Sequence, residues 1–454
     1  MNKNLKLFIG VVIAVLAYLS ARVYFIENHA LLIACIALLV TLWTNEALPL
    51  GVVSLLPMIL FPAFGLLTTS EVADSYANPI IFLFLGGFML AIATQQTGLH
   101  RVIAHKILQV FPATPRGIIF SMALTSALLS AFLSNTTTAV LLISIALFLT
   151  DDRALKVRLV LAVAYGASIG GIITPIGTPP NLILLGFFES QALAPIGFMQ
   201  WIVMTLPLAM VMLLVIGFVL SYGVEASPIA DFEQDTQLSK PQKQLALILL
   251  GMVLLLLVNS PVKPFYDGLG ISEKGILLGF GLLMFMPFLG FLQWEDTKKI
   301  PYEIIFLFGA GFSIARAFLD TGFAGEIANL LTSFSHIETF YLVLLIAAFV
   351  TFSTEITSNT ALVSMILPVI YALAVDTGLN HQLFLMVATI CASYAFMLPI
   401  ATPPNAIAMS SGVIRIKDML SRGLLFNLVG VLMIALCAVF YWSGFFDSTL
   451  KPLS

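Results

Sequence analysis

Charged side chains are scarce in this sequence. They make up 9% of the 454 residues, whereas roughly 25% is usual in soluble domains, and 60% of the residues are hydrophobic. So few charges cannot keep a folded chain of this size in water, which excludes a soluble protein. The formal net charge is only −3, so the sequence also gives no indication of a nucleic-acid partner.

Cysteine and histidine are also rare. The three cysteines, Cys35, Cys391 and Cys437, lie in separate apolar stretches, and the five histidines are scattered. This spacing matches neither a disulfide framework nor a metal-binding cluster. The apolar stretches also lack a pair of aspartates or a serine–histidine pair, one of which an intramembrane hydrolase would need. We therefore expect a protein that is not an enzyme.

Long apolar runs, in contrast, are abundant. Most of them approach the roughly 20 residues that a helix needs to cross a bilayer. We expect an all-α polytopic membrane protein with about 11 transmembrane helices and two re-entrant hairpins. Residues 1–29 should form an N-terminal transmembrane helix, because the first apolar run lacks a small-residue cleavage site and further spans follow it.

The chain contains an internal repeat at a fixed offset of 224 residues. Chance similarity between apolar helices would not hold one register or repeat rare polar motifs, so the offset indicates a duplication. The matched pairs include IIFLF at 80–84 and 304–308, Ser-Asn-Thr at 134–136 and 358–360, and Thr-Pro-Pro-Asn at 178–181 and 402–405.

An odd number of expected crossings separates the two copies, which inverts the second copy relative to the first. Repeat 1 should cover residues 30–222 and repeat 2 residues 245–446, joined by a cytoplasmic linker at 223–244. Each repeat is expected to hold scaffold helices, a re-entrant hairpin (117–150 and 339–374) and a broken helix (157–190 and 382–412).

The basic residues favour a cytoplasmic N-terminus. In that orientation Arg22, Lys263, Lys274 and Lys451 lie outside and Arg316 lies near a membrane face, which leaves 15 of the 20 lysines and arginines inside. Loops on the cytoplasmic side normally carry the excess of Lys and Arg. We therefore predict a multi-pass protein of the plasma (inner) membrane with its N-terminus in the cytoplasm.

Two polar motifs, at residues 130–138 and 354–360, interrupt otherwise apolar stretches. We expect each motif to form the tip of a re-entrant hairpin. Non-helical backbone survives at membrane depth only where it is buried in protein or lines a wet cavity, so each tip should face a site. Its carbonyl and hydroxyl oxygens suit a small cation, and the N–H groups that start the return helix suit an anion.

The two Thr-Pro-Pro-Asn segments predict broken helices. Their prolines lack N–H donors and cannot continue the preceding helix, which should unwind near 173–180 and again near 398–404. Gly177 and Ala401 are small enough for an ion or substrate to approach the backbone. An isolated motif of this kind often only joins or kinks helices, but broken helices paired across a repeat point to a transport site at the membrane midplane.

The paired motifs contain no cationic side chain. A dianion held there by hydroxyls, amides and helix ends needs further positive charge, which bound cations would supply. This favours sodium coupling, although proton coupling or anion exchange would also balance the charge. Glu355 is the one acidic residue beside a motif, and its repeat counterpart is Ala131. It is either a structural support or a ligand for an ion or proton.

At these motifs the chain resembles the divalent anion/sodium symporter family, which includes di- and tricarboxylate carriers. The resemblance extends over about residues 30–445 and rests on the two Ser-Asn-Thr and two Thr-Pro-Pro-Asn motifs. It implies a homodimer in which a transport domain moves against a scaffold domain, by an elevator-type alternating-access mechanism. The lipid bilayer and a small dianionic substrate are the other partners that it implies.

The same resemblance implies the residues of the site. Two or more Na⁺ sites are expected, one with Ser130, Ser134, Asn135 and Gly177, and one with Thr354, Thr357, Asn359 and Ala401. The residues expected to bind the substrate are Ser134, Asn135, Thr136, Thr178, Pro179, Ser358, Asn359, Thr360, Thr402 and Pro403.

The leading hypothesis is therefore a secondary active transporter for sodium-coupled symport of a small divalent anion. A C4-dicarboxylate such as succinate, malate or fumarate is the first candidate. A sodium-independent dicarboxylate exchanger and a carrier of citrate or sulfate are the alternatives. A passive anion channel fits poorly with broken helices in an inverted repeat.

Overall fold

The computed structural model describes residues 2–45, 47–224, 237–260, 266–323, 325–326 and 338–447. Most of the predicted linker at 223–244, together with Lys263 and Lys451, lies outside these residues. The described part is built from helices and contains no strand, which confirms the all-α fold.

In chain order the helices begin with α1 (Lys3–Ala21), α2 (Glu27–Asn45), α3 (Leu50–Val53), α4 (Pro57–Ala63), α5 (Thr69–Tyr76), α6 (Pro79–Thr97), α7 (Leu99–Leu108), α8 (Pro115–Ser130), α9 (Asn135–Phe148), α10 (Arg153–Gly171), α11 (Pro179–Ser190) and α12 (Phe198–Ser221). They continue with α13 (Lys240–Asn259), α14 (Glu273–Leu283), the 3-10 helix η1 (Trp294–Lys299), α15 (Tyr302–Asp320), α17 (Thr339–Thr354), α18 (Asn359–Asp376), α19 (His381–Ala392), α20 (Pro403–Ser410), α21 (Ile416–Cys437), the π-helix η3 (Ala438–Trp442) and α22 (Ser443–Asp447).

Eight helical stretches in the described residues are long and apolar enough to cross a membrane. Other apolar helices, among them α9, α17, α18 and α19, are shorter, because the chain breaks within the segments that the sequence marks as polar. A count of spans by helix length leaves such short helices out, so the number of about 11 spans stays a prediction.

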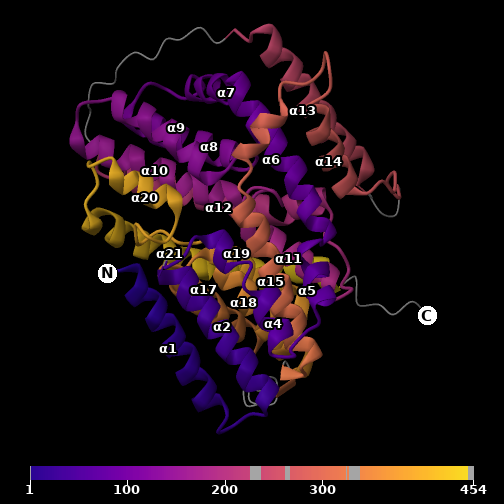
Figure 1. The fold of residues 1–454 in the computed structure, drawn as a ribbon. Coiled ribbons are helices and arrows are strands. Elements are labelled where there is room, and N and C mark those ends of the chain that lie inside the picture. Colours follow the sequence, from indigo (N-terminus) through magenta and orange to yellow (C-terminus); the bar gives the residue numbers. More distant parts are fainter. Residues whose placement is uncertain are drawn as a thin grey trace.

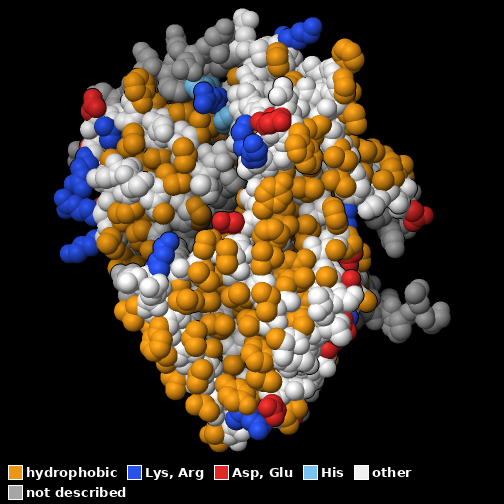
Figure 2. All heavy atoms as spheres, viewed as in Figure 1, with side chains coloured by type: hydrophobic (Ala, Val, Ile, Leu, Met, Phe, Trp, Pro, Cys, Tyr) orange, Lys and Arg blue, Asp and Glu red, His pale blue; other side chains and the backbone are white. Residues whose placement is uncertain are grey.

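The outer surface is apolar over much of the molecule. Hydrophobic side chains cover most of the lower part in Figure 2, whereas Lys and Arg side chains gather towards its upper and left edges. On α1, for example, Phe8 is 65% exposed and Leu16 is 58% exposed. A water-soluble monomer does not present so large an apolar surface, which is instead suited to lipid.

Helices around the two polar motifs recur at the offset of the sequence repeat. Helices α8 and α17 match in length, α9 and α18 both begin at the Asn of Ser-Asn-Thr, and α11 and α20 both begin at the first Pro of Thr-Pro-Pro-Asn. The two breaks differ, however. The unwound segment covers 172–178 in the first copy and 393–402 in the second, where it starts earlier than expected.

Each broken helix sends its second half across to the other repeat. Helix α20 packs against α9 and α10, whereas α11 packs against α15 and α18 (Figure 1). The two repeats therefore interlock, and both unwound segments are brought into the same central region between the two hairpins.

Close backbone contact fixes helix α10 against the first hairpin, which consists of α8 and α9. A Cβ atom placed on Gly170 would lie 2.2 Å from the carbonyl oxygen of Ala127 on α8, and one placed on Gly166 would lie 2.5 Å from that of Ala123. Only glycine permits this approach, as is common where helices pack in membranes. The break that follows α10 is thereby held at a fixed place beside the hairpin tip.

Candidate functional site

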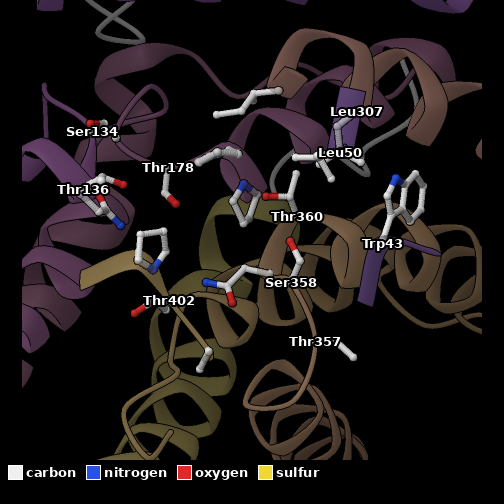
Figure 3. Close-up of a pocket in the computed structure, with 18 of the residues that line it drawn as sticks. Trp43, Leu50, Ser134, Thr136, Thr178, Leu307, Thr357, Ser358, Thr360 and Thr402 are labelled. Carbon is white, nitrogen blue, oxygen red and sulfur yellow. The ribbon is translucent and has the colours of Figure 1, made fainter. Parts of the chain in front are cut away.

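One cavity of about 670 Å³ lies where the four polar motifs meet. The starts of α9, α11, α18 and α20 all line it, so four helix N-termini converge on one space (Figure 3). Each N-terminus carries partial positive charge from the aligned peptide dipoles. All ten residues expected to bind the substrate line this cavity, namely Ser134, Asn135, Thr136, Thr178, Pro179, Ser358, Asn359, Thr360, Thr402 and Pro403.

The four N-termini are not equivalent as hydrogen-bond donors. Helices α11 and α20 each begin with two prolines, which have no N–H group to offer. Helices α9 and α18 begin with Asn-Thr, whose first-turn N–H groups have no partner within their own helix. Carboxylate oxygens in the cavity would therefore accept hydrogen bonds from backbone N–H groups at α9 and α18. At α11 and α20 they would meet only the partial positive charge of the helix dipole.

A pair of oxygen atoms lies directly behind each of these two N-termini. Ser130 Oγ lies 2.5 Å from Asn135 Oδ1, and Thr354 Oγ1 lies 2.6 Å from Asn359 Oδ1. Ser130 and Thr354 are fully buried and form a layer beneath the cavity wall. The other residues expected at the sodium sites line the cavity itself: Ser134, Asn135, Gly177, Thr357, Asn359 and Ala401.

Asparagine side chains hold both helix breaks open. Asn181 Nδ2 donates to the carbonyl oxygens of Gly171 and Thr174, both at 2.9 Å. Asn405 Nδ2 donates to Ala395 O at 3.0 Å and to Leu398 O at 3.1 Å, at the same offset of 224 residues. These bonds replace the helical partners that the carbonyls lose at the break.

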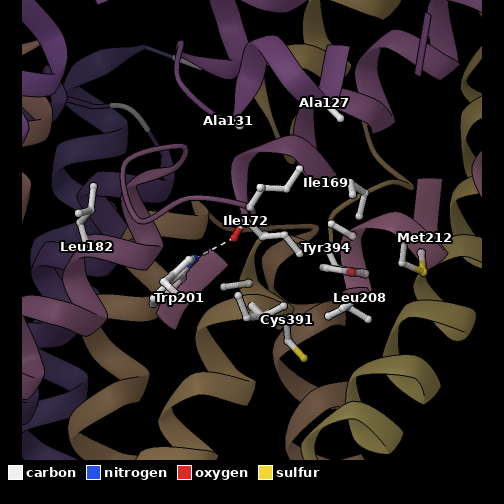
Figure 4. Close-up of a cluster of buried hydrophobic side chains, with 14 of the residues drawn as sticks. Ala127, Ala131, Ile169, Ile172, Leu182, Trp201, Leu208, Met212, Cys391 and Tyr394 are labelled. Atoms are coloured by element: carbon white, nitrogen blue, oxygen red, sulfur yellow. Dashed lines mark hydrogen bonds between the residues drawn. The ribbon is translucent and has the colours of Figure 1, made fainter. Parts of the chain in front are cut away.

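Helix α12 stabilises the first break from the opposite side. Trp201 Nε1 donates to Ile172 O at 2.9 Å, within a cluster of buried apolar side chains that includes Leu208 and Tyr394 (Figure 4). Thr205 Oγ1 donates to Ile173 O at 3.1 Å. No pattern in the sequence connects Trp201 or Thr205 with the candidate site, because neither belongs to a repeated motif.

The oxygen atoms around both breaks are suitable ligands for Na⁺. Asn181 Oδ1 and Asn405 Oδ1 are fully buried and receive no hydrogen bond from the described residues. Together with Asn135 Oδ1 and Asn359 Oδ1 they provide neutral hard oxygens beside unwound backbone. Transporters coordinate sodium with such carbonyl and side-chain oxygens.

Glu355 supports the second break. Its carboxylate accepts hydrogen bonds from the backbone N–H groups of Phe396, Met397 and Leu398, at 2.7, 2.9 and 2.9 Å, and from Asn427 Nδ2 at 2.6 Å. The side chain is 3% exposed and does not line the cavity. This geometry favours structural support over an ion or proton role, and the three N–H bonds explain why the second unwound segment begins early.

The first repeat secures its break differently. At the position of Glu355 it has Ala131, whose carbonyl oxygen accepts a hydrogen bond from Thr174 Oγ1. A side-chain hydroxyl from the break thus binds the hairpin backbone in one copy, whereas a side-chain carboxylate from the hairpin binds the break backbone in the other. Each copy thus links its hairpin to its break, although the residues that form the link differ.

Four further residues line the cavity that the sequence motifs did not indicate: Lys6, Trp43, Thr44 and Asn45. They come from the start of α1 and the end of α2, outside the matched motifs of the repeat. The packing of α1 against α2 places Lys6 beside the end of α2, and no motif in the sequence points to any of the four.

The Glu355→Gln variant should lose stability. A glutamine can keep its amide oxygen at the position of Oε1, but its NH₂ group then faces the Leu398 N–H that Oε2 binds, which should cost about 1–3 kcal/mol. We expect a lower melting temperature for the purified variant in detergent, with substrate transport reduced in parallel. Glu295→Gln, at an exposed glutamate of η1, is the matched control. An unchanged melting temperature for Glu355→Gln would contradict the supporting role.

Comparison with known proteins gives consistent results along the whole chain. The family model described as citrate transporter matches residues 36–388. The sodium-dependent dicarboxylate transporter SdcS of Staphylococcus saprophyticus is 31% identical, over 96% of this chain and 92% of its own length. SdcS of Staphylococcus aureus (strain USA300) is 31% identical, over 95% of this chain and 90% of its own length.

Two solved structures share the fold. The YdaH transporter of Alcanivorax borkumensis has a TM-score of 0.60 at 16% identity and covers 92% of this chain and 98% of its own. MtrF of Neisseria gonorrhoeae, from a class of antimetabolite efflux pumps, has a TM-score of 0.57 at 14% identity and covers 91% and 95%. With the family match and the near full-length relatives, these findings show that the chain is a multi-pass membrane transport protein and belongs to the divalent anion/sodium symporter family.

Proposed function

We propose that the protein is a secondary active transporter that couples the movement of Na⁺ to uptake of a C4-dicarboxylate such as succinate, malate or fumarate. The observation that carries this proposal is the pair of oxygen clusters, Ser130 with Asn135 and Thr354 with Asn359, each directly behind a helix N-terminus that faces the same cavity. The similarity to the two SdcS proteins, which are named sodium-dependent dicarboxylate transporters, supports it.

The geometry suggests how the ion and the anion depend on each other. Ser130 Oγ donates its hydrogen to Asn135 Oδ1. A sodium ion bound between these oxygens would need both as acceptors, so the hydroxyl hydrogen would turn away. Asn135 Oδ1 would then bind the ion while its amide nitrogen stays free to donate to a carboxylate. Thr354 and Asn359 form the corresponding pair in the second copy, where Ala392 O, 2.8 Å from Thr354 Oγ1, is a second acceptor for the single hydroxyl hydrogen.

The two carboxylates of the substrate would lie between α9 and α18. In this proposal Asn135 and Thr136 bind one carboxylate and Asn359 and Thr360 bind the other, through side chains and first-turn N–H groups. The remaining wall is formed by Ser134, Ser358, Thr178, Pro179, Thr402 and Pro403, and the sodium ligands are completed by Gly177, Thr357 and Ala401.

Movement of the site would follow an elevator-type mechanism. The interlocking of α11 and α20 with the opposite repeats supports this, because it makes the hairpins and broken helices one body that can move as a unit. We further propose a homodimer in the plasma (inner) membrane with the N-terminus in the cytoplasm, as the family resemblance and the distribution of basic residues suggest.

The direct test is uptake of labelled succinate into proteoliposomes that contain the purified protein. An inward Na⁺ gradient is compared with an equal K⁺ gradient. We expect saturable uptake that requires Na⁺. Uptake without Na⁺ that depends on internal dicarboxylate would make the protein an exchanger. Uptake of citrate in place of succinate would favour a citrate carrier, in line with the citrate transporter family that matches the chain.

Asn135→Ala and Asn359→Ala should each abolish coupled uptake, because each removes a ligand that the ion and the substrate share. Both asparagines are partly exposed to the cavity, so both variants should still fold and insert into the membrane. Uptake into the same proteoliposomes tests the loss of transport. The elution volume of the purified variants in detergent tests whether they fold. Normal transport by either variant would contradict the assignment of the site.

A further inference from the structure

One residue with a formal charge lines the cavity. Among the described residues that line it, Lys6 alone is ionisable as a cation, and none is Asp or Glu. The other lining groups are hydroxyls, amides, prolines and apolar side chains. A dianion that enters this space therefore meets one full positive charge that belongs to the protein.

Lys6 lies on the wall formed by α1 and α2. Trp43, from the end of α2, lies across the cavity from Ser134 and Thr136 in Figure 3. Thr44 and Asn45 line the same wall next to it. The cation is thus contributed by a part of the chain that is separate from the hairpins and broken helices.

The position of Lys6 is fixed by contacts between the two helices. Asn45 Nδ2 donates to Lys6 O at 3.0 Å, which joins the start of α1 to the end of α2. One turn further along α1, a Cβ atom on Gly10 would lie 3.0 Å from Leu42 Cδ2, so the helices are in close contact. The backbone of Lys6 therefore cannot slide along α2 without loss of this packing.

The polar neighbours of Lys6 on this wall already have partners. Thr44 Oγ1 donates to Val40 O at 2.8 Å, Trp43 Nε1 donates to Ser54 Oγ at 3.2 Å, and Asn45 Oδ1 accepts from Ala47 N at 2.9 Å. No carboxylate among the described residues lies within ion-pair distance of Lys6. The ammonium group is thus the group on this wall that remains available for an anion.

We propose that Lys6 is a specificity-determining residue that recruits the dianionic substrate to the cavity. Its charge attracts the anion from the wall opposite the hairpins, and it adds to the neutral hydrogen-bond donors of α9 and α18. The inference rests on the proposed function, and it adds a cation that the paired motifs do not contain. An isolated charge at the edge of a water-filled cavity should change affinity for a dianion roughly threefold to tenfold.

An alternative role for a lysine near a helix start is to reach towards the lipid headgroups. Lys3 distinguishes the two roles, because it lies on the same helix, is exposed and does not line the cavity. Loss of either lysine would affect the membrane interface, but only loss of Lys6 would affect the charge of the cavity.

The test is equilibrium binding of succinate to the purified full-length protein in detergent, at saturating and constant Na⁺. Four proteins are compared: wild type, Lys6→Gln, Lys6→Arg and Lys3→Gln. We expect Kd to rise roughly threefold to tenfold for Lys6→Gln and to change less than about twofold for Lys6→Arg and Lys3→Gln. Added choline chloride should shrink the difference between Lys6→Gln and wild type, because salt screens a charge in an open cavity.

Wild-type affinity in Lys6→Gln would overturn the proposal, as would an equal loss in Lys3→Gln or a loss in Lys6→Arg as large as in Lys6→Gln. A wild-type protein that binds no succinate in Na⁺ would instead refute the proposed substrate. In that case the same four proteins are titrated with citrate, and the same differences in Kd decide the role of Lys6.

Discussion

The central constraint on the proposed site is that neutral groups inside a membrane protein must hold a doubly charged anion. Hydroxyls, amides and helix N-termini provide only partial charges, and Lys6 is the one full positive charge among the described residues of the cavity. At a separation of about 5 Å and an effective dielectric constant of about 20, one charge pair contributes about 3 kcal/mol. Bound cations are therefore a large part of the energy that such a site can offer.

In the proposed site the fold meets this constraint by placing two similar half-sites in one cavity. Each hairpin brings a helix N-terminus with an oxygen pair behind it, and each broken helix brings unwound backbone next to that pair. The crossing of α11 and α20 to opposite repeats holds the halves together. Asn181, Asn405 and Glu355 keep the unwound backbone in place without lining the cavity, so they serve the site indirectly.

Sequence reasoning identified the motifs of the candidate site because their residues are unusual where they occur. Paired prolines cannot continue a helix, and Ser-Asn-Thr is rare within an apolar stretch, so both indicate a break whatever the surroundings are. The role of Glu355 could not be decided in this way, because it depends on three N–H groups more than forty residues further along the chain.

Other features depend on packing that no local pattern encodes. Lys6 lies at the cavity because α1 packs against the end of α2, where Asn45 Nδ2 binds its carbonyl oxygen. Trp201 and Thr205 reach the first break only because α12 lies against it. The number of spans is equally hard to obtain from hydropathy, since half-helices such as α11 and α20 are too short to register as crossings.

In the mechanism that we propose, cations and the dianion stabilise each other in one cavity. The most direct measurement is the Kd of succinate for the purified protein as a function of Na⁺ concentration, together with the apparent Na⁺ affinity as a function of succinate concentration. We expect each ligand to tighten binding of the other by the same factor, as linkage requires. A succinate Kd that does not change when Na⁺ is replaced by K⁺ would contradict it.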